Sequence, residues 1–510
     1  MASSLSTAAE HVGEMLSLKR LGTLFYIVTP NSTTFETVEE VPNYINEAIP
    51  WFIVSVVVEH FLGLLMLGRK PGRLADNLTS VGHATLYESF KLFTRWFEMS
   101  GYLWLYEHRF FDIPWRSPLA WWAGFIAADF VYYWFHRASH EVSVIWAWHQ
   151  VHHSHEDYNV TVALRQSMFQ RLCALGFYHP MALLGVPLPA ICVHWHLNLL
   201  VQFLIHTDLV GKCGPLEWIF NTPSHHRVHH GANKYCLDKN YGGFLIVWDR
   251  LFGTFEAERD DDPVVYGLVD QPQASGVFYL QFFYIRDVLE KARQQATWGD
   301  SVKALVYGPG WVPGAPRLGN MDTFPDVKAP RTKYDPQIPF WLKVYVSTHF
   351  LVILFLQQLF TFNLKRGFYR CHSCHPSFFV HFLLTHLLLL VAGTASVHSH
   401  VRASGFVCQG CVKAILEKEM FPMVGAAGVF LFILTSICNI TAMFDAWPWV
   451  GAVELLRCGV YVAYARITPV TGLPLIDQLL TSIFFVSAVI WTFRTTLAPL
   501  GTAAKILKAL

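Results

Sequence analysis

The stretch that decides the fold is PLAWWAGFIAADFVYYWFHRASHEVSVIWAWHQVHHSH, residues 118–155. Its first part, residues 118–135, is a nearly unbroken apolar run of about the length that a membrane-spanning helix requires. Its second part holds six histidines, the first at His136 and the last at His155. We therefore predict an apolar helix that ends in a metal-binding group of imidazoles near the membrane surface.

The composition of the whole chain agrees with a membrane protein. Of its 510 residues, 53% are hydrophobic and 15% are charged, whereas soluble globular chains carry about 25% charged residues. The 38 basic and 37 acidic side chains leave a formal charge of +1, so no strong field indicates a nucleic-acid partner. We predict an all-α, polytopic helical bundle in a lipid bilayer, with no obligate protein partner.

Other apolar runs predict the remaining membrane segments. Residues 172–209 are mostly apolar but contain Pro187 and Pro189, which interrupt a helix. We expect a helical hairpin there, which returns the chain to the side that it left and brings the later histidines to the earlier ones. Further candidate spans are 49–67, 341–362, 377–397, 421–440 and 475–497.

The basic residues Arg69, Lys70 and Arg73 directly follow the first span. By the positive-inside rule this end is cytosolic. For the histidines to face the cytosol as well, residues 84–106 must cross the membrane although they carry four charged residues. A re-entrant or interfacial segment is the alternative.

The apolar runs and the histidine motifs divide the chain into four parts. Residues 1–117 form an N-terminal transmembrane region, and residues 118–256 carry the histidine groups. Residues 257–340, which include GPGWVPGAPRLG, are predicted to be a cytosolic loop rich in Pro and Gly without helical periodicity. Residues 341–510 form a C-terminal transmembrane region with an atypical insertion at about 366–418.

The histidines recur at helical spacing, in the order HxxxH, HxxHH and HxxHH. Residues three and four apart lie on one face of a helix, so each motif presents its imidazoles together. One metal uses three or four protein nitrogens, so nine such imidazoles indicate two metals. Imidazole suits Zn, Cu, Fe and Ni alike. The predicted ligands are His136, His140, His149, His152, His153, His225, His226, His229 and His230.

Two further residues are candidates for the same site. His206 lies near the end of the returning arm and is expected to be a tenth ligand, since histidine within an apolar segment is costly and usually functional. A position behind a ligand or in the core is the alternative for His206. His196, ten residues earlier, is expected to be structural. Glu141 directly follows His140 and is the candidate catalytic carboxylate, either orienting an imidazole or transferring protons. A solvated surface acid is the alternative for Glu141.

The three histidine motifs resemble those of the fatty acid hydroxylase and sterol desaturase superfamily of integral-membrane di-iron oxygenases. The segments NTPSHHRVHHG (221–231), DKNYGG (238–243) and WDRLFGTFEAE (248–258) are similar to its ether-lipid-cleaving branch. The likeness is best over residues 118–256. It implies two iron ions, O2, tetrahydrobiopterin as the reductant and a place in the endoplasmic reticulum membrane. In this pattern the second motif ends at His153, so His155 is not expected to be a ligand.

The resemblance implies a monooxygenase that hydroxylates the ether-linked carbon of 1-alkylglycerols and lyso ether lipids. The O-alkyl bond would then break to give a fatty aldehyde and a glycerol derivative. A sterol or fatty acyl hydroxylase or desaturase of the same superfamily is one alternative, because it would use the same motifs. A membrane metal-binding protein or transporter is another, although transporters place their ligands near the bilayer midplane and these motifs lie at a helix end.

Four cysteines form two CxxC pairs, Cys371 with Cys374 and Cys408 with Cys411. Such pairs are typical of a zinc site. The apolar run 377–397 between them is long enough to cross a bilayer, which would place the pairs on opposite sides. We therefore expect no shared zinc ion.

Overall fold

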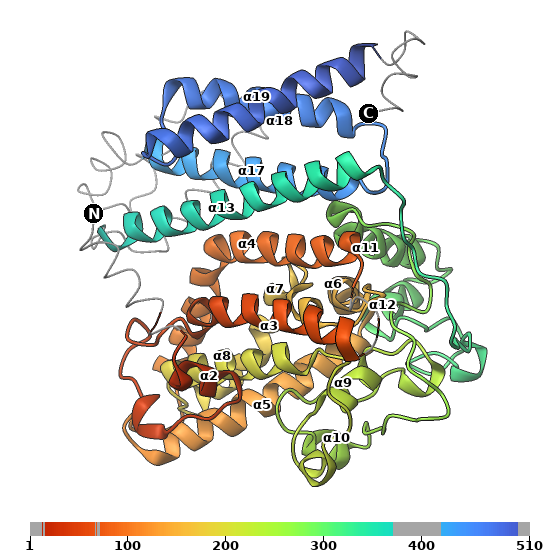
Figure 1. Ribbon diagram of the computed structural model, residues 1–510. Helices are drawn as coiled ribbons and strands as arrows, with labels where there is room; N and C mark the ends of the chain where they lie inside the picture. Colours follow the sequence, from red (N-terminus) through yellow and green to blue (C-terminus); the bar gives the residue numbers. More distant parts are fainter. Residues whose placement is uncertain (1–12, 14–15, 67, 69–71, 371–419, 498–510) are drawn as a thin grey trace. The chain divides into compact units, whose positions relative to one another are not determined.

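The computed structural model describes residues 13–497 except 14–15, 67, 69–71 and 371–419, and Figure 1 labels its helices. The described residues form helices and no β-strand, with only two isolated bridges between extended residues. This confirms the all-α prediction. The predicted span 377–397 and both CxxC pairs lie outside the described residues.

The chain divides into two compact units. The first consists of Met1–Tyr87 and Glu98–Gln337, and the second of Glu88–Phe97 and Ile338–Leu510. Helix α4 (Leu74–Glu107) contributes to both units and contains the whole of the charged segment 84–106. All the predicted site residues belong to the first unit.

Four helices in the described part of the chain are long and apolar enough to cross a membrane. They are α3 (Tyr44–Met66), α8 (Leu188–Ile205), the first part of α13 (Phe340–Arg370) and most of α19 (Pro474–Leu497). Helix α17 (Met420–Ala442) includes a shorter apolar stretch. The predicted span 118–135 does form a helix, but that helix is not one of these four. The four apolar helices fit the predicted membrane protein.

The predicted hairpin is confirmed. Helix α7 (Gln170–Leu183) runs out and α8 returns, and Pro187 caps the start of α8. Gly185 in the turn has a φ of +82°, and a Cβ there would meet the Phe111 carbonyl oxygen at 2.0 Å. Only glycine therefore fits this turn.

Helix α5 (Pro118–Glu141) carries the first histidine motif. It begins with Pro118 in its first turn, and the Ser117 hydroxyl accepts a hydrogen bond from the Leu119 amide at 3.2 Å. Both features favour a helix start. The chain is extended at Val142 and then begins α6 (Ser143–His153), so the second motif lies on a separate helix that packs against α5.

A buried carboxylate on α5 fixes a distant loop. Asp129 accepts hydrogen bonds from Asn198 on α8 at 2.9 Å and from the Trp248 indole at 2.9 Å. It also accepts from the backbone amides of Phe244 and Leu245. The segment that follows the third histidine motif is thereby held against α5 and α8.

The prediction of an irregular loop over residues 257–340 is wrong for its middle part. Helices α11 (Val277–Arg293) and α12 (Trp298–Val306) form there. Helix α11 buries Leu280, Phe283 and Val288 on one face, which packs against α6. The Pro- and Gly-rich stretch that follows α12 is irregular, as predicted.

Candidate metal centre

Nine buried histidines form two groups in the first unit. Within each group every residue offers one ligand atom, and these atoms all lie within 4.8 Å of one another. The first group is His136, His140, His149, His153 and His229, and the second is His152, His206, His226 and His230. The structure thus brings together nine of the ten predicted ligands.

Helices α6 and α9 (Pro223–His229) each supply both groups. On α6, His149 and His153 join the first group and the intervening His152 joins the second. On α9 the order is reversed: His226 and the C-cap residue His230 join the second group, and His229 joins the first. The identical HxxHH motifs therefore face each other, and the His153 and His230 rings stack with centroids 4.4 Å apart.

Backbone carbonyls set which ring nitrogen faces the centre. His136 Nδ1 lies 2.9 Å from the Tyr241 carbonyl oxygen, and His229 Nδ1 lies 2.9 Å from that of Lys239. His206 Nδ1 is hydrogen-bonded to the Gln202 carbonyl in the same way. Since a carbonyl only accepts, each Nδ1 carries the proton and each Nε2 is left with a free lone pair, as a metal ligand requires.

The ring nitrogens of the second group are better satisfied by a metal ion than by hydrogen bonds to one another. His206 Nε2 lies 2.9 Å from His226 Nε2 and 3.1 Å from His230 Nε2. Burial lowers the pKa of His226 and His230 well below the usual value, so these imidazoles are neutral at neutral pH. Several lone pairs directed at one buried point need a cation, and an all-imidazole set fits a transition metal.

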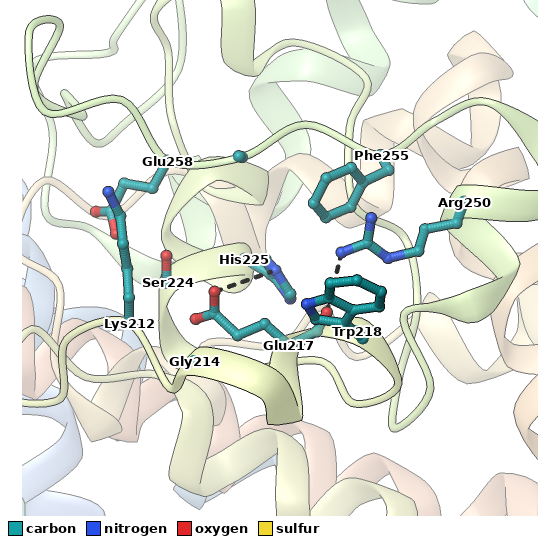
Figure 2. Close-up of a pocket in the computed structure, with 10 residues that line it drawn as sticks. Lys212, Gly214, Glu217, Trp218, Ser224, His225, Arg250, Phe255 and Glu258 are labelled. Carbon is teal, nitrogen blue, oxygen red and sulfur yellow. Dashed lines mark hydrogen bonds and ion pairs between the residues drawn. The ribbon is translucent and has the colours of Figure 1, made fainter.

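The structure does not bring His225 to either group. Figure 2 shows its ring at a separate cavity of about 270 Å³, facing Glu217. His225 Nε2 lies 3.9 Å from Glu217 Oε2, and its ring packs against Phe255 with centroids 5.2 Å apart. His225 lies in the first turn of α9, one turn before His229, and its contacts there are with Glu217 and Phe255.

Glu141 forms ion pairs and is not placed against an imidazole. Arg137 Nε donates to its Oε1 at 2.8 Å, and Arg317 pairs with its Oε2. Asp238, and not Glu141, approaches an imidazole of the first group. Its Oδ1 lies 3.8 Å from His140 Nδ1. Asp238 has a φ of +59°, and no spacing rule in the sequence relates it to His140.

Sequence reasoning also gave no role to His155. His155 Nδ1 lies 3.1 Å from the Asp157 carbonyl oxygen, and its Nε2 lies 3.0 Å from His230 Nδ1. The carbonyl accepts the Nδ1 proton of His155, so His155 Nε2 accepts from His230 Nδ1. His230 is then left with Nε2 free, directed at His206 and His226.

We predict that His155→Ala weakens iron binding at the second group by about 10- to 100-fold, the usual cost of losing a partner behind a ligand. The His230 ring would lose the hydrogen bond that selects its tautomer. Iron retained after dialysis against a graded chelator series measures the effect, and His155→Asn should recover part of it. Iron retention equal to that of the unaltered protein would contradict this role.

A buried acid joins the second group to the apolar helix α3. Glu59, on α3, accepts hydrogen bonds from Thr207 Oγ1 at 2.6 Å and from the Val160 amide at 2.8 Å. Thr207 directly follows His206. An ionisable residue on an apolar helix usually has a function, and here it fixes the turn that carries His206.

Residues 121–254 match the Fatty acid hydroxylase family. The human protein named alkylglycerol monooxygenase is 43% identical over 339 residues, which cover 66% of this chain and 76% of the human protein. The chain belongs to the alkylglycerol monooxygenase family.

Other members of the alkylglycerol monooxygenase family show the same degree of likeness. The Xenopus tropicalis member is 42% identical over 65% of this chain and 74% of its own length. The Caenorhabditis elegans member is 38% identical over 67% of this chain and 71% of its own length. No solved structure matches the chain. Family membership confirms the resemblance and makes this protein a lipid monooxygenase with a histidine-rich metal site.

Proposed function

We propose that the protein is a tetrahydrobiopterin-dependent di-iron monooxygenase that cleaves 1-alkylglycerols and lyso ether lipids. The observation that carries this proposal is the pair of adjacent, buried histidine groups in a chain of the alkylglycerol monooxygenase family. Nine imidazoles are too many for one ion, and their division into a group of five and a group of four fits one ion in each group.

The nine histidines of the two groups would hold the two iron ions, which would supply the O2-activating chemistry. Insertion of one oxygen atom of O2 into the C–H bond beside the ether oxygen gives a hemiacetal, and the other oxygen atom leaves as water with two electrons and two protons supplied by tetrahydrobiopterin. The hemiacetal hydroxyl then loses its proton while the glycerol oxygen gains one. The C–O bond breaks, and a fatty aldehyde and glycerol are released.

The residues around the metals position the reaction and exclude water. All nine histidines are buried, which keeps bulk water from the reacting carbon. Helix α3 exposes a run of apolar side chains, including Val57 and Phe61, whereas its Glu59 is buried against the turn after His206. We propose that the lipid tail enters along this apolar helix while the polar glycerol head stays at the loops.

We further propose that the site faces the cytosol from the endoplasmic reticulum membrane. Arg73, close to the basic end of the first span, donates from Nε to Asp157 Oδ2 at 2.7 Å. Asp157 lies two residues beyond His155, so this basic end and the histidine loops share one side of the first unit. Glycosylation tags inserted near Arg73 should stay unmodified, whereas modification there would contradict a cytosolic site.

The experiment that tests the proposed reaction measures fatty aldehyde released from a 1-alkylglycerol by the purified protein. We expect release only with O2 and tetrahydrobiopterin together. With heavy-isotope O2, the label should appear in the aldehyde, trapped at once by reduction to the alcohol, and not in the glycerol. Equal release with a cytochrome-based electron donor and no pterin would favour another member of the superfamily. Label in the glycerol would contradict hydroxylation of the alkyl carbon.

A further inference from the structure

A second cavity, of about 630 Å³, lies in the first unit, and no histidine of the two metal groups lines it. Its walls come from α11, from the start of α6 and from the polar segment 269–272. Its volume is in the usual range for small-molecule sites. Because its lining includes polar loop residues and no residue of α3 or α8, we expect its ligand to come from water.

Aromatic rings and carboxylates share this cavity. Tyr279 and Phe283, one turn apart on α11, have nearly parallel rings with an interplanar angle of 10°. Asp270 and Asp287 also line the cavity. Asp287 uses Oδ1 to bind the neighbouring Arg286, which leaves its other oxygen for a ligand.

Two aromatic residues connect this cavity to the first metal group. Tyr284 lines the cavity, and its ring lies edge-on to the Trp146 ring with centroids 6.4 Å apart. The Trp146 ring in turn lies 4.9 Å from the His140 ring and 5.4 Å from the His153 ring, measured between centroids. A ligand in the cavity is therefore separated from the metal ligands by one tyrosine and one tryptophan.

We propose that this cavity is the binding site for the reduced pterin. The flat pterin ring would stack on the aromatic side chains of α11. Its amino group and adjacent ring N–H are donors side by side, which a carboxylate such as Asp270 or Asp287 accepts. This inference rests on the proposed pterin dependence and adds the place where the pterin binds.

Pterin bound in this cavity would also explain how electrons reach the metal groups. A tetrahydropterin that becomes a dihydropterin gives up two electrons and two protons. The two electrons reduce two ferric ions to ferrous ions, and the protons pass to water at the open side of the cavity. The path through Tyr284 and Trp146 lets the electrons move while the lipid occupies the metal site from the membrane side.

The cavity at His225 is a weaker candidate for the pterin. Glu258 pairs with Arg227 through both oxygens, and Glu217 accepts from the Cys213 amide through Oε1 while its Oε2 faces His225. The ring of His225 packs on Phe255, and no ring contact from it reaches a metal-group histidine among the described residues.

The test is a titration of the purified, iron-loaded full chain with biopterin, the oxidised and fluorescent form, followed by fluorescence anisotropy. We expect the double variant Asp270→Asn/Asp287→Asn to bind at least about tenfold more weakly, because two charged acceptors are lost. Both side chains are exposed, so the fold should be unaffected. Two controls should keep the original affinity: Glu290→Gln, an exposed acid on the same helix, and Glu217→Gln in the other cavity.

A second variant separates binding from electron delivery. Trp146→Phe should bind biopterin with unchanged affinity but slow the reduction of ferric iron by tetrahydrobiopterin, followed anaerobically by absorbance. Unchanged biopterin affinity in the double aspartate variant, or weaker binding in Glu217→Gln alone, would overturn this site. If the unaltered protein binds no pterin and releases aldehyde with another reductant, the proposed pterin dependence fails as well.

Discussion

Replacing His206 with alanine is expected to lower aldehyde release by more than about a hundredfold, because the loss of a ligand costs more than the loss of a partner behind one. His206 Nε2 lies within 3.3 Å of ring nitrogens of His152, His226 and His230, so it contacts every other member of the second group. Iron should fall from about two ions per chain to about one. Aldehyde assays and metal analysis on the same preparation measure both effects.

His196→Ala is the matched control. His196 lies ten residues earlier on the same returning arm, where its ring packs against Trp195 and Tyr44. It belongs to neither metal group. We expect its iron content to stay unchanged and its activity to stay within about threefold of the unaltered protein, as for a structural contact. If both variants lost activity equally at equal amounts of folded protein, His206 would not be a ligand.

Replacing Glu454, in the second unit, is expected to cause the largest loss in the free energy of unfolding. Glu454 and Arg457 form an ion pair on α18 (Val450–Ile467) whose side chains are both 0% exposed. Glu454 also accepts from Asn439 Nδ2 at 2.8 Å, and Arg457 binds His349 Nδ1 at 3.0 Å. Glu454→Leu leaves the guanidinium buried without its counter-ion, at a cost of about 3–5 kcal/mol.

The double variant Glu454→Leu/Arg457→Leu shows whether stability is lost because a buried charge has no partner or because packing contacts are lost. Removal of both charges is often nearly neutral because neither has to be desolvated. Thermal unfolding of the full chain in detergent should therefore show a lower midpoint for the single variant and partial recovery in the double one. A single variant as stable as the unaltered protein would mean that water or lipid reaches the pair.

The sequence predicted the metal groups well because helical spacing alone determines most of the geometry. HxxxH and HxxHH require only that each motif be helical, and α5, α6 and α9 all are. The hairpin that joins them could also be predicted, since Pro187 and the long apolar run on either side of it indicate a reversal. His206 could be predicted as a ligand because placing a histidine in an apolar segment costs free energy and usually serves a function.

Spacing could not distinguish ligands from neighbours within a run of consecutive histidines. His225 and His226 lie in the same sequence motif. Only the orientation of the seven-residue helix α9 directs His226 to the metal group and His225 to Glu217. Asp238 and His155 reach the ligands through loop conformation, which has no periodicity to detect. Helix α11 was missed because the Pro- and Gly-rich stretch after it led us to treat the whole segment as irregular.

The central claim is that two metals, each held by one histidine group, perform the reaction. The most direct test is the amount of iron per chain in purified protein of increasing specific activity, measured by metal analysis against amino-acid quantitation. The account predicts that activity rises in proportion to iron and reaches its maximum at about two ions per chain. Full activity at one ion per chain, or with no iron at all, would contradict it.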